Sequence, residues 1–206
     1  MQGSPNKART AHQQSYEALR DMILNGTIAQ GTKLVEEKLA AEFNLSRTPI
    51  RESIRKLEQE GLVVNKRVVK LSESDLRNTF ELRKLLEGHA ARSAAIYLSE
   101  KDLLRLERCV EVGRSGTLNE IMEVNKEFHE IIMHASNNPL MIDVFDRMQS
   151  VIYLFRHTVV YYHRPFLIDE HQRIFEAIRA HDSDTAEQLM KEHLQADLDF
   201  CLHLIR

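Results

Sequence analysis

Three histidines stand where helical spacing turns side chains toward a protein interior. His171 lies three and seven residues before Ile174 and Ile178, so it shares their apolar face. His193 falls in register with apolar neighbours of its own segment, and His129 stands at the edge of an apolar stripe. Imidazoles that converge in a dry interior are readily satisfied around a transition-metal ion. The alternative is that each is a hydrogen-bonded core histidine, and the spacing is compatible with both interpretations.

A three-histidine metal centre with an open position also suits a metal-dependent hydrolase, because the metal activates water. Such an enzyme needs a general base close to the metal. Glu130 and Glu170 adjoin histidines in the sequence, which predicts that they point to other faces of their helices. The sequence contains no phosphate-binding glycine loop, G-x-S-x-G motif, H-E-x-x-H motif or paired-cysteine zinc motif. It therefore favours binding over catalysis.

Two arginines of the C-terminal half are further candidates for binding. Arg83 and Glu87 are four residues apart on the inward face of one helical segment. One interpretation is an ion pair between neighbouring turns of that helix. The other is that Arg83 offers its planar guanidinium to the carboxylate of a ligand inside the protein. Arg164 sits between two helical segments, where a plain loop is favoured over the mouth of a pocket.

A basic cluster lies in the N-terminal third. Arg47, Arg51 and Arg55 recur every four residues, on a solvent-facing side of a predicted helix. Thr48 is expected to cap this helix, and Pro49 to occupy its first position. A short helix, a tight turn and a second helix that starts with arginines are typical of a helix-turn-helix that binds DNA.

Two β-prone runs follow this helix, at 62–64 and 68–71, and predict a small hairpin. A hairpin behind a helix-turn-helix is a wing. Its tip consists of Asn65, Lys66 and Arg67, and the two basic side chains are expected to contact the DNA backbone.

The charge distribution supports contact between the N-terminal part and nucleic acid. The net charge of the 206 residues is −3, which by itself argues against DNA. Residues 1–70, however, carry 12 Lys and Arg against 8 Asp and Glu, and the remainder carries 16 against 23, so the two parts have net charges of +4 and −7. This asymmetry is expected when one part of a protein binds phosphate.

The composition is that of an ordinary globular protein. No apolar run approaches membrane-spanning length, and the N-terminus lacks the apolar core of a signal peptide. Cys109 and Cys201 form neither a disulfide framework nor a metal-type pair. We therefore expect a cytoplasmic protein without a membrane partner.

The helical spacing of the histidines and arginines predicts a mainly α fold with two domains. After a flexible tail at 1–10, we expect a winged helix-turn-helix DNA-binding domain at 11–71. An all-helical domain at 72–206 is expected to bind an effector and to dimerise, as an antiparallel six-helix bundle with short loops. The six helices are predicted at about 72–98, 99–113, 117–135, 139–161, 165–180 and 183–204.

The chain resembles the GntR family of bacterial transcription regulators. The N-terminal resemblance runs from Leu39 to Val63 through the string Leu-Ser-Arg-Thr-Pro-Ile-Arg-Glu. The remainder is similar to the ligand-binding domain of the FadR subfamily in its six-helix, VanR-like form. The matching stretches are Glu81-Leu82-Arg83 to Glu87, Phe128-His129, Asn137-Asn138-Pro139-Leu140, Glu170-His171 to Ala177-Ile178 and Lys191-Glu192-His193-Leu194.

For the N-terminal part, the resemblance implies a homodimer on a palindromic double-stranded DNA operator. It places Arg47 and Arg51 among the recognition-helix residues that meet DNA, together with Ser46 and Thr48. The wing departs from the family pattern, because the usual glycines near its tip are missing and Asn65 begins a short turn.

For the C-terminal part, the resemblance implies a divalent metal held by an aspartate and three histidines, with a small carboxylate effector completing its shell. The histidine positions fall on His129, His171 and His193, and Asn125 occupies the aspartate position. An amide oxygen coordinates without charge, so lower metal affinity is expected, with zinc or nickel as the favoured ion. The resulting prediction is a ligand-responsive transcription regulator. The metal-dependent hydrolase and a metal-free regulator of the same fold remain as alternatives.

Overall fold

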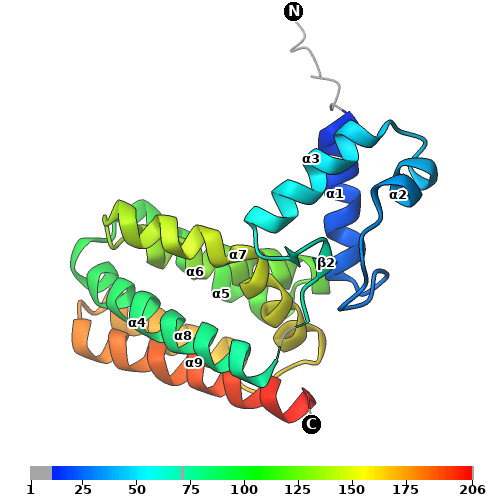
Figure 1. The fold of residues 1–206 in the computed structure, drawn as a ribbon. Helices are drawn as coiled ribbons and strands as arrows, with labels where there is room; N and C mark the ends of the chain where they lie inside the picture. Colours follow the sequence, from blue (N-terminus) through cyan, green and yellow to red (C-terminus); the bar gives the residue numbers. More distant parts are fainter. Residues whose placement is uncertain (1–10, 71, 206) are drawn as a thin grey trace, which may run out of the picture. The chain divides into compact units, whose positions relative to one another are not determined.

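A computed structural model describes residues 11–70 and 72–205 of the chain (Figure 1). The predicted flexible tail at 1–10 lies outside the described residues. So does Leu71, the predicted last residue of the DNA-binding domain. The chain divides into two compact units, residues 1–70 and 71–206, and each is described by itself.

The N-terminal unit consists of three helices and a hairpin. Its elements are α1 (Ala11–Leu24), α2 (Glu36–Glu42), α3 (Arg47–Gln59), β1 (Val63–Val64) and β2 (Arg67–Val68). Helix α1 packs against α3, and Ser15 and Ser53 share a buried hydrogen bond of 2.8 Å between the two helices. Leu19 and Leu57 are fully buried beside it. The periodic apolar residues of α3 thus hold the helix in place while its arginines face solvent.

The start of α3 differs from the sequence prediction. The helix begins at Arg47 with Ser46 as its N-cap residue, so the prediction that Thr48 caps it is wrong. Pro49 is consequently the third residue of the helix and not the first. This costs no hydrogen bond, because the first four N–H groups of a helix have no partner within it.

The predicted hairpin is present, with a two-residue turn. Strands β1 and β2 pair antiparallel, with Val63 opposite Val68 and Val64 opposite Arg67. Asn65 and Lys66 between them have φ angles of 50° and 58°. Positive φ at both central residues is the pattern of the type I′ turn that matches strand twist. Asparagine tolerates this conformation better than most residues, which lets the wing turn without glycine.

The C-terminal unit is a bundle of six described helices. They are α4 (Glu73–Tyr97), α5 (Glu100–Ser115), α6 (Leu118–His134), α7 (Pro139–Tyr161), α8 (Leu167–Arg179) and α9 (Ser183–Ile205). The most extensive packing joins α4 to α9, which lie side by side in Figure 1. Ser72 and Thr117 begin α4 and α6 with capping boxes. Helix α8 starts later than the predicted 165, because Phe166 before it has a left-handed φ of 62°.

The apolar stripes of the helices form one continuous core in this unit. Phe80, Leu106, Phe128, Ile132 and Leu194 are fully buried within it. Within the part of the chain that the structure describes, no helix is long and apolar enough to cross a membrane.

Replacing a core side chain should cost far more stability than replacing an exposed one. Ile132→Ala removes a fully buried side chain and should lower the free energy of unfolding by about 2–5 kcal/mol. Leu140→Ala is the control, because Leu140 is 78% exposed, and its effect should stay within about 0.5 kcal/mol. Urea titrations followed by circular dichroism measure both, and equal effects would contradict the assignment of the core.

Candidate functional site

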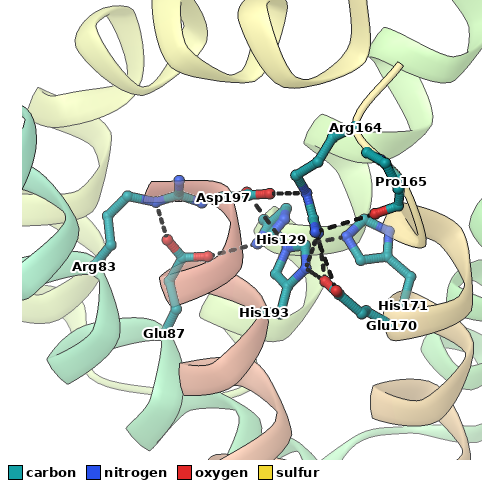
Figure 2. Close-up of polar contacts among 9 residues, drawn as sticks. All are labelled: Arg83, Glu87, His129, Arg164, Pro165, Glu170, His171, His193 and Asp197. Carbon is teal, nitrogen blue, oxygen red and sulfur yellow. Dashed lines mark hydrogen bonds and ion pairs between the residues drawn. The ribbon is translucent and has the colours of Figure 1, made fainter. Parts of the chain in front are cut away.

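Three buried histidines converge at the centre of the C-terminal bundle (Figure 2). His129 comes from α6, His171 from α8 and His193 from α9, and each is at most 2% exposed. One nitrogen from each ring lies within 4.8 Å of the others. The two Nε2 atoms of His171 and His193 are 3.3 Å apart. Three different helices thus bring together the histidines that helical spacing turned inward.

Carboxylates contact the Nδ1 atoms of two of the histidine rings. His129 Nδ1 lies 2.6 Å from Glu87 Oε2, and His193 Nδ1 lies 2.8 Å from Glu170 Oε2. An ionised carboxylate only accepts hydrogen bonds, so each Nδ1 carries the proton and donates it. In a neutral ring with this arrangement, Nε2 carries no proton and its lone pair is available to a metal. Metal-binding histidines are typically oriented in this way.

The histidine cluster fits a transition metal in its chemistry and, for one pair of rings, in its spacing. Two imidazoles on one tetrahedral zinc ion, with Zn–N bonds of about 2.0–2.1 Å, have nitrogens about 3.4 Å apart. The separation of His171 and His193 is close to this value. The same separation also suits a hydrogen bond between the rings if one Nε2 carries a proton. The arrangement therefore accommodates both the metal centre and the metal-free alternative.

The residue at the predicted aspartate position is buried near the cluster. Asn125 is 3% exposed and precedes His129 by one turn of α6. An anionic group comes instead from α9. Asp197 is 5% exposed, follows His193 by one turn, and places its Oδ2 atom 3.7 Å from His193 Nε2. Asp197 was not among the predicted site residues, although its spacing of four residues from an inward histidine indicates the same helix face.

Arg164 is part of the site, contrary to the prediction of a plain loop. Its side chain is 4% exposed, lies between two carboxylates and pairs with both oxygens of Glu170. Its Nε atom is 2.7 Å from Asp197 Oδ1, an ion pair in which neither atom has an aligned hydrogen bond. His163 and Phe166 on either side both have positive φ, so the backbone turns sharply around Arg164.

Glu170 also departs from expectation. It was predicted to point away from the histidines because it adjoins His171 in sequence. It instead contacts His193, a histidine of another helix. Burial raises the pKa of Glu170, but His193 and Arg164 outweigh this effect and hold its pKa below the usual value.

Arg83 forms the ion pair that its spacing suggested. Its Nε atom donates to Glu87 Oε1 at 2.6 Å, and both side chains are almost completely buried. Burial alone raises the pKa of Glu87, but the charge of Arg83 and the contact with His129 lower it below the usual value. Glu87 therefore stays ionised and orients the His129 ring.

A cavity of about 400 Å³ lies in the same unit. Arg164 lines it, together with the polar side chains of Arg114, His163 and Asp169. The other lining residues are apolar or glycine: Gly113, Gly116, Leu118, Ile121, Val159, Val160, Phe166, Leu167 and Ile168. Small-molecule sites commonly combine apolar walls with a few polar groups in this way.

In the N-terminal unit, two arginines of α3 and a lysine of the wing approach one glutamate. Glu36 of α2 is 8% exposed and accepts a hydrogen bond of 3.0 Å from Arg51 Nε. Lys66 of the wing reaches the same carboxylate, with Nζ 2.7 Å from Oε1. Arg47 pairs mainly with Glu37, at 3.0 Å. Glu36 was not among the predicted site residues, because its partners are 15 and 30 residues away in the sequence.

The cations lower the pKa of Glu36 below its usual value. The hydrogen bond from Lys66 is the largest cause, and burial opposes it. The cationic side chains remain about half exposed. Arg67 is exposed and donates to the carbonyl oxygen of Gly31, at 3.2 Å. Ser46 and Thr48 are exposed at the start of α3.

Two family descriptions match consecutive parts of the chain. Residues 11–68 match the bacterial regulatory proteins of the gntR family, and residues 78–196 match the FCD domain. The repressor RspR of Escherichia coli (strain K12) is 29% identical over 92% of this chain and 88% of its own length. The regulator YdhC of Bacillus subtilis (strain 168) is 30% identical over 93% and 91%.

A solved structure shares the fold. E. coli McbR/YncC superposes with a TM-score of 0.75 at 20% identity, over 97% of this chain and 100% of that one. The family and these relatives are transcriptional regulators, so the hydrolase alternative is not supported and the chain is not an enzyme. The chain belongs to the GntR family of bacterial transcription regulators, with an N-terminal gntR helix-turn-helix and a C-terminal FCD domain.

Proposed function

We propose that this regulator is a repressor that binds a palindromic operator as a homodimer and responds to a small carboxylate effector. Residues 11–71 bind DNA, and residues 72–206 bind the effector and dimerise. The observation that carries the proposal is the exposed arginine pair on α3, oriented by the buried Glu36. Repression is inferred from RspR, whose name describes a repressor.

Base recognition is assigned to Arg51 and Arg47. Arg51 uses Nε to bind Glu36, which leaves its two Nη groups for the O6 and N7 atoms of a guanine. Ser46 and Thr48, at the start of the same helix, are suited to a phosphate. The wing residue Lys66 and its neighbour Arg67 add contacts to the DNA backbone.

Dimerisation is assigned to the C-terminal unit. Leu82, Leu85 and Ile96 of α4 are 37–63% exposed, although they are large and apolar. A second copy of the chain would remove this surface from water. A symmetric dimer also explains a palindromic operator, because its two DNA-binding units are related by a twofold axis.

The effector site is assigned to the centre of the FCD bundle. His129, His171 and His193, with Asn125 nearby, would hold a zinc or nickel ion. When bound, such an ion offers an open position to a carboxylate oxygen. Arg83 binds Glu87 through Nε on the Nδ1 side of His129. It is the proposed second contact of the effector carboxylate, and this contact requires the effector to reach past the His129 ring. Regulation requires that the effector bind the DNA-competent and DNA-incompetent states with different affinities.

Arg51→Ala tests the proposed base contact. An operator is first selected from a random DNA library with the wild-type protein. The variant should then bind it more weakly by about 1–3 kcal/mol, because a bidentate contact to guanine is lost. Fluorescence anisotropy measures the affinity.

Arg77→Ala is the matched control for Arg51→Ala. It removes the same charge from an exposed position of α4 and should leave the affinity unchanged. Scrambling one half of the operator should weaken wild-type binding if two units bind together. Unchanged affinity of Arg51→Ala for the intact operator would refute its role.

Glu36→Gln tests the electrostatic support of the DNA-binding face. The folded-state pKa of Glu36 is lowered, so its ionised form stabilises the fold. This contribution is complete above the unfolded-state pKa, at about 4.3, and is lost as the pH falls through the lower folded-state value. The variant should therefore be less stable than wild type at pH 7, with a difference that shrinks below about pH 4. Thermal unfolding across pH measures this, with the exposed Glu37→Gln as control.

Removing the metal tests the histidine centre. Protein purified without a histidine tag should contain a divalent metal, and chelation should lower its unfolding temperature. Restoring the ion at about 100 times its dissociation constant should return about 2.7 kcal/mol of stability. His171→Gln should abolish the effect, whereas His134→Gln, an exposed histidine of α6, should retain it. Protein without metal and without a response to zinc or nickel would establish the metal-free alternative.

A further inference from the structure

The metal centre proposed above lacks a charge at the position where the family carries an aspartate. Asn125 is neutral, and three neutral imidazoles add no charge either. A divalent ion held by these groups alone would be a buried, uncompensated charge, which is strongly unfavourable in a protein interior. Before an effector carboxylate binds, the compensating charge has to come from another position in the chain.

Three buried or half-buried carboxylates approach the histidines, and they do so from different sides. Glu87 and Glu170 lie against the Nδ1 atoms of His129 and His193. Those contacts orient the rings from the side opposite the nitrogens that face the centre. Asp197 instead lies 3.7 Å from the Nε2 atom of His193. Of these three carboxylates, Asp197 is thus the one beside an Nε2 atom. The ligand atoms that lie within 4.8 Å of one another are those of the three histidines, so the Asp197 side chain would have to rotate toward a bound ion.

We infer that Asp197 is the anionic ligand of this metal centre and takes the role of the aspartate that Asn125 replaces. This inference rests on the proposed metal site. Two ligand atoms on one zinc ion lie about 3.0–3.5 Å apart. The Oδ2 atom of Asp197 is within a few tenths of an ångström of that range from His193 Nε2. Because the two residues are one helical turn apart on α9, they present their ligand atoms on the same face.

The second oxygen of Asp197 is held in place by Arg164. Its Oδ1 atom lies 2.7 Å from Arg164 Nε, and Arg164 is in turn fixed by Glu170 (Figure 2). A ligating carboxylate commonly has its other oxygen bound to a neighbouring group. Arg164 is therefore a positioning residue for Asp197, and it also lines the 400 Å³ cavity.

Zinc titration of four chains, followed by calorimetry, tests the assignment. Asp197→Asn keeps the shape of the side chain and should weaken zinc binding to the apo-protein by about 100-fold or more, beyond the 10–100-fold expected for a residue outside the ligand shell. Asp199→Asn is the control, because Asp199 is exposed on the same helix, and its affinity should equal that of wild type. The double variant Asn125→Asp with Asp197→Asn should return to within about tenfold of wild type.

Asn125→Asp alone provides a measurement that does not depend on how Asp197→Asn folds. If Asp197 already supplies the anion, an added aspartate should raise zinc affinity by less than about tenfold. Cobalt(II) absorption supplies a direct reading of the ligands: Asp197→Asn should change the visible spectrum, whereas the exposed Asp199→Asn should preserve it.

Three outcomes would overturn the inference. They are wild-type zinc affinity in Asp197→Asn, an unchanged cobalt spectrum in that variant, and a rise of several hundredfold in Asn125→Asp. Wild-type protein that binds no metal would overturn the metal centre as a whole, while leaving the DNA-binding proposal intact. Circular dichroism of each apo-protein confirms that the variants are folded.

Discussion

The C-terminal unit is organised by the requirement that charges removed from water be paired. Arg83, Glu87, Arg164 and Asp197 are all nearly inaccessible to solvent. Ionised groups of this kind cost several kcal/mol each unless partners surround them. Their partners come from five segments of the unit: α4, α6, the connection after α7, α8 and α9. The polar centre therefore restricts how the helices pack, and the apolar core closes around it.

The same requirement acts on a smaller scale in the N-terminal unit. Glu36 is shielded from solvent and draws Arg51 of the recognition helix and Lys66 of the wing toward one point. Because both cations remain half exposed, they keep the capacity to bind another anion. In the C-terminal unit the ion pairs are buried and orient histidines. In the N-terminal unit they lie at the surface and orient arginines.

Much of this architecture follows from periodicity in the sequence. The helices of the C-terminal unit lie close to their predicted positions, because apolar residues at helical spacing leave few alternatives. The inward direction of His129, His171 and His193 followed from the same argument. Periodicity does not predict which residue a buried polar side chain will contact. Glu170 meets His193 from 23 positions away, and Arg164 enters the site only through a backbone turn with positive φ at non-glycine residues.

The turn of the wing has a consequence for the thermodynamics of association. Lys66 donates its backbone N–H to Glu58 of α3, and its carbonyl oxygen accepts from the backbone N–H of Leu34. Its side chain adds a third attachment, to Glu36. A surface arm that is ordered before it meets its target loses little conformational entropy on contact. The short, glycine-free tip of this wing therefore extends less far than a longer tip but is more rigid. Because less entropy is lost on binding, more of its interaction energy contributes to affinity.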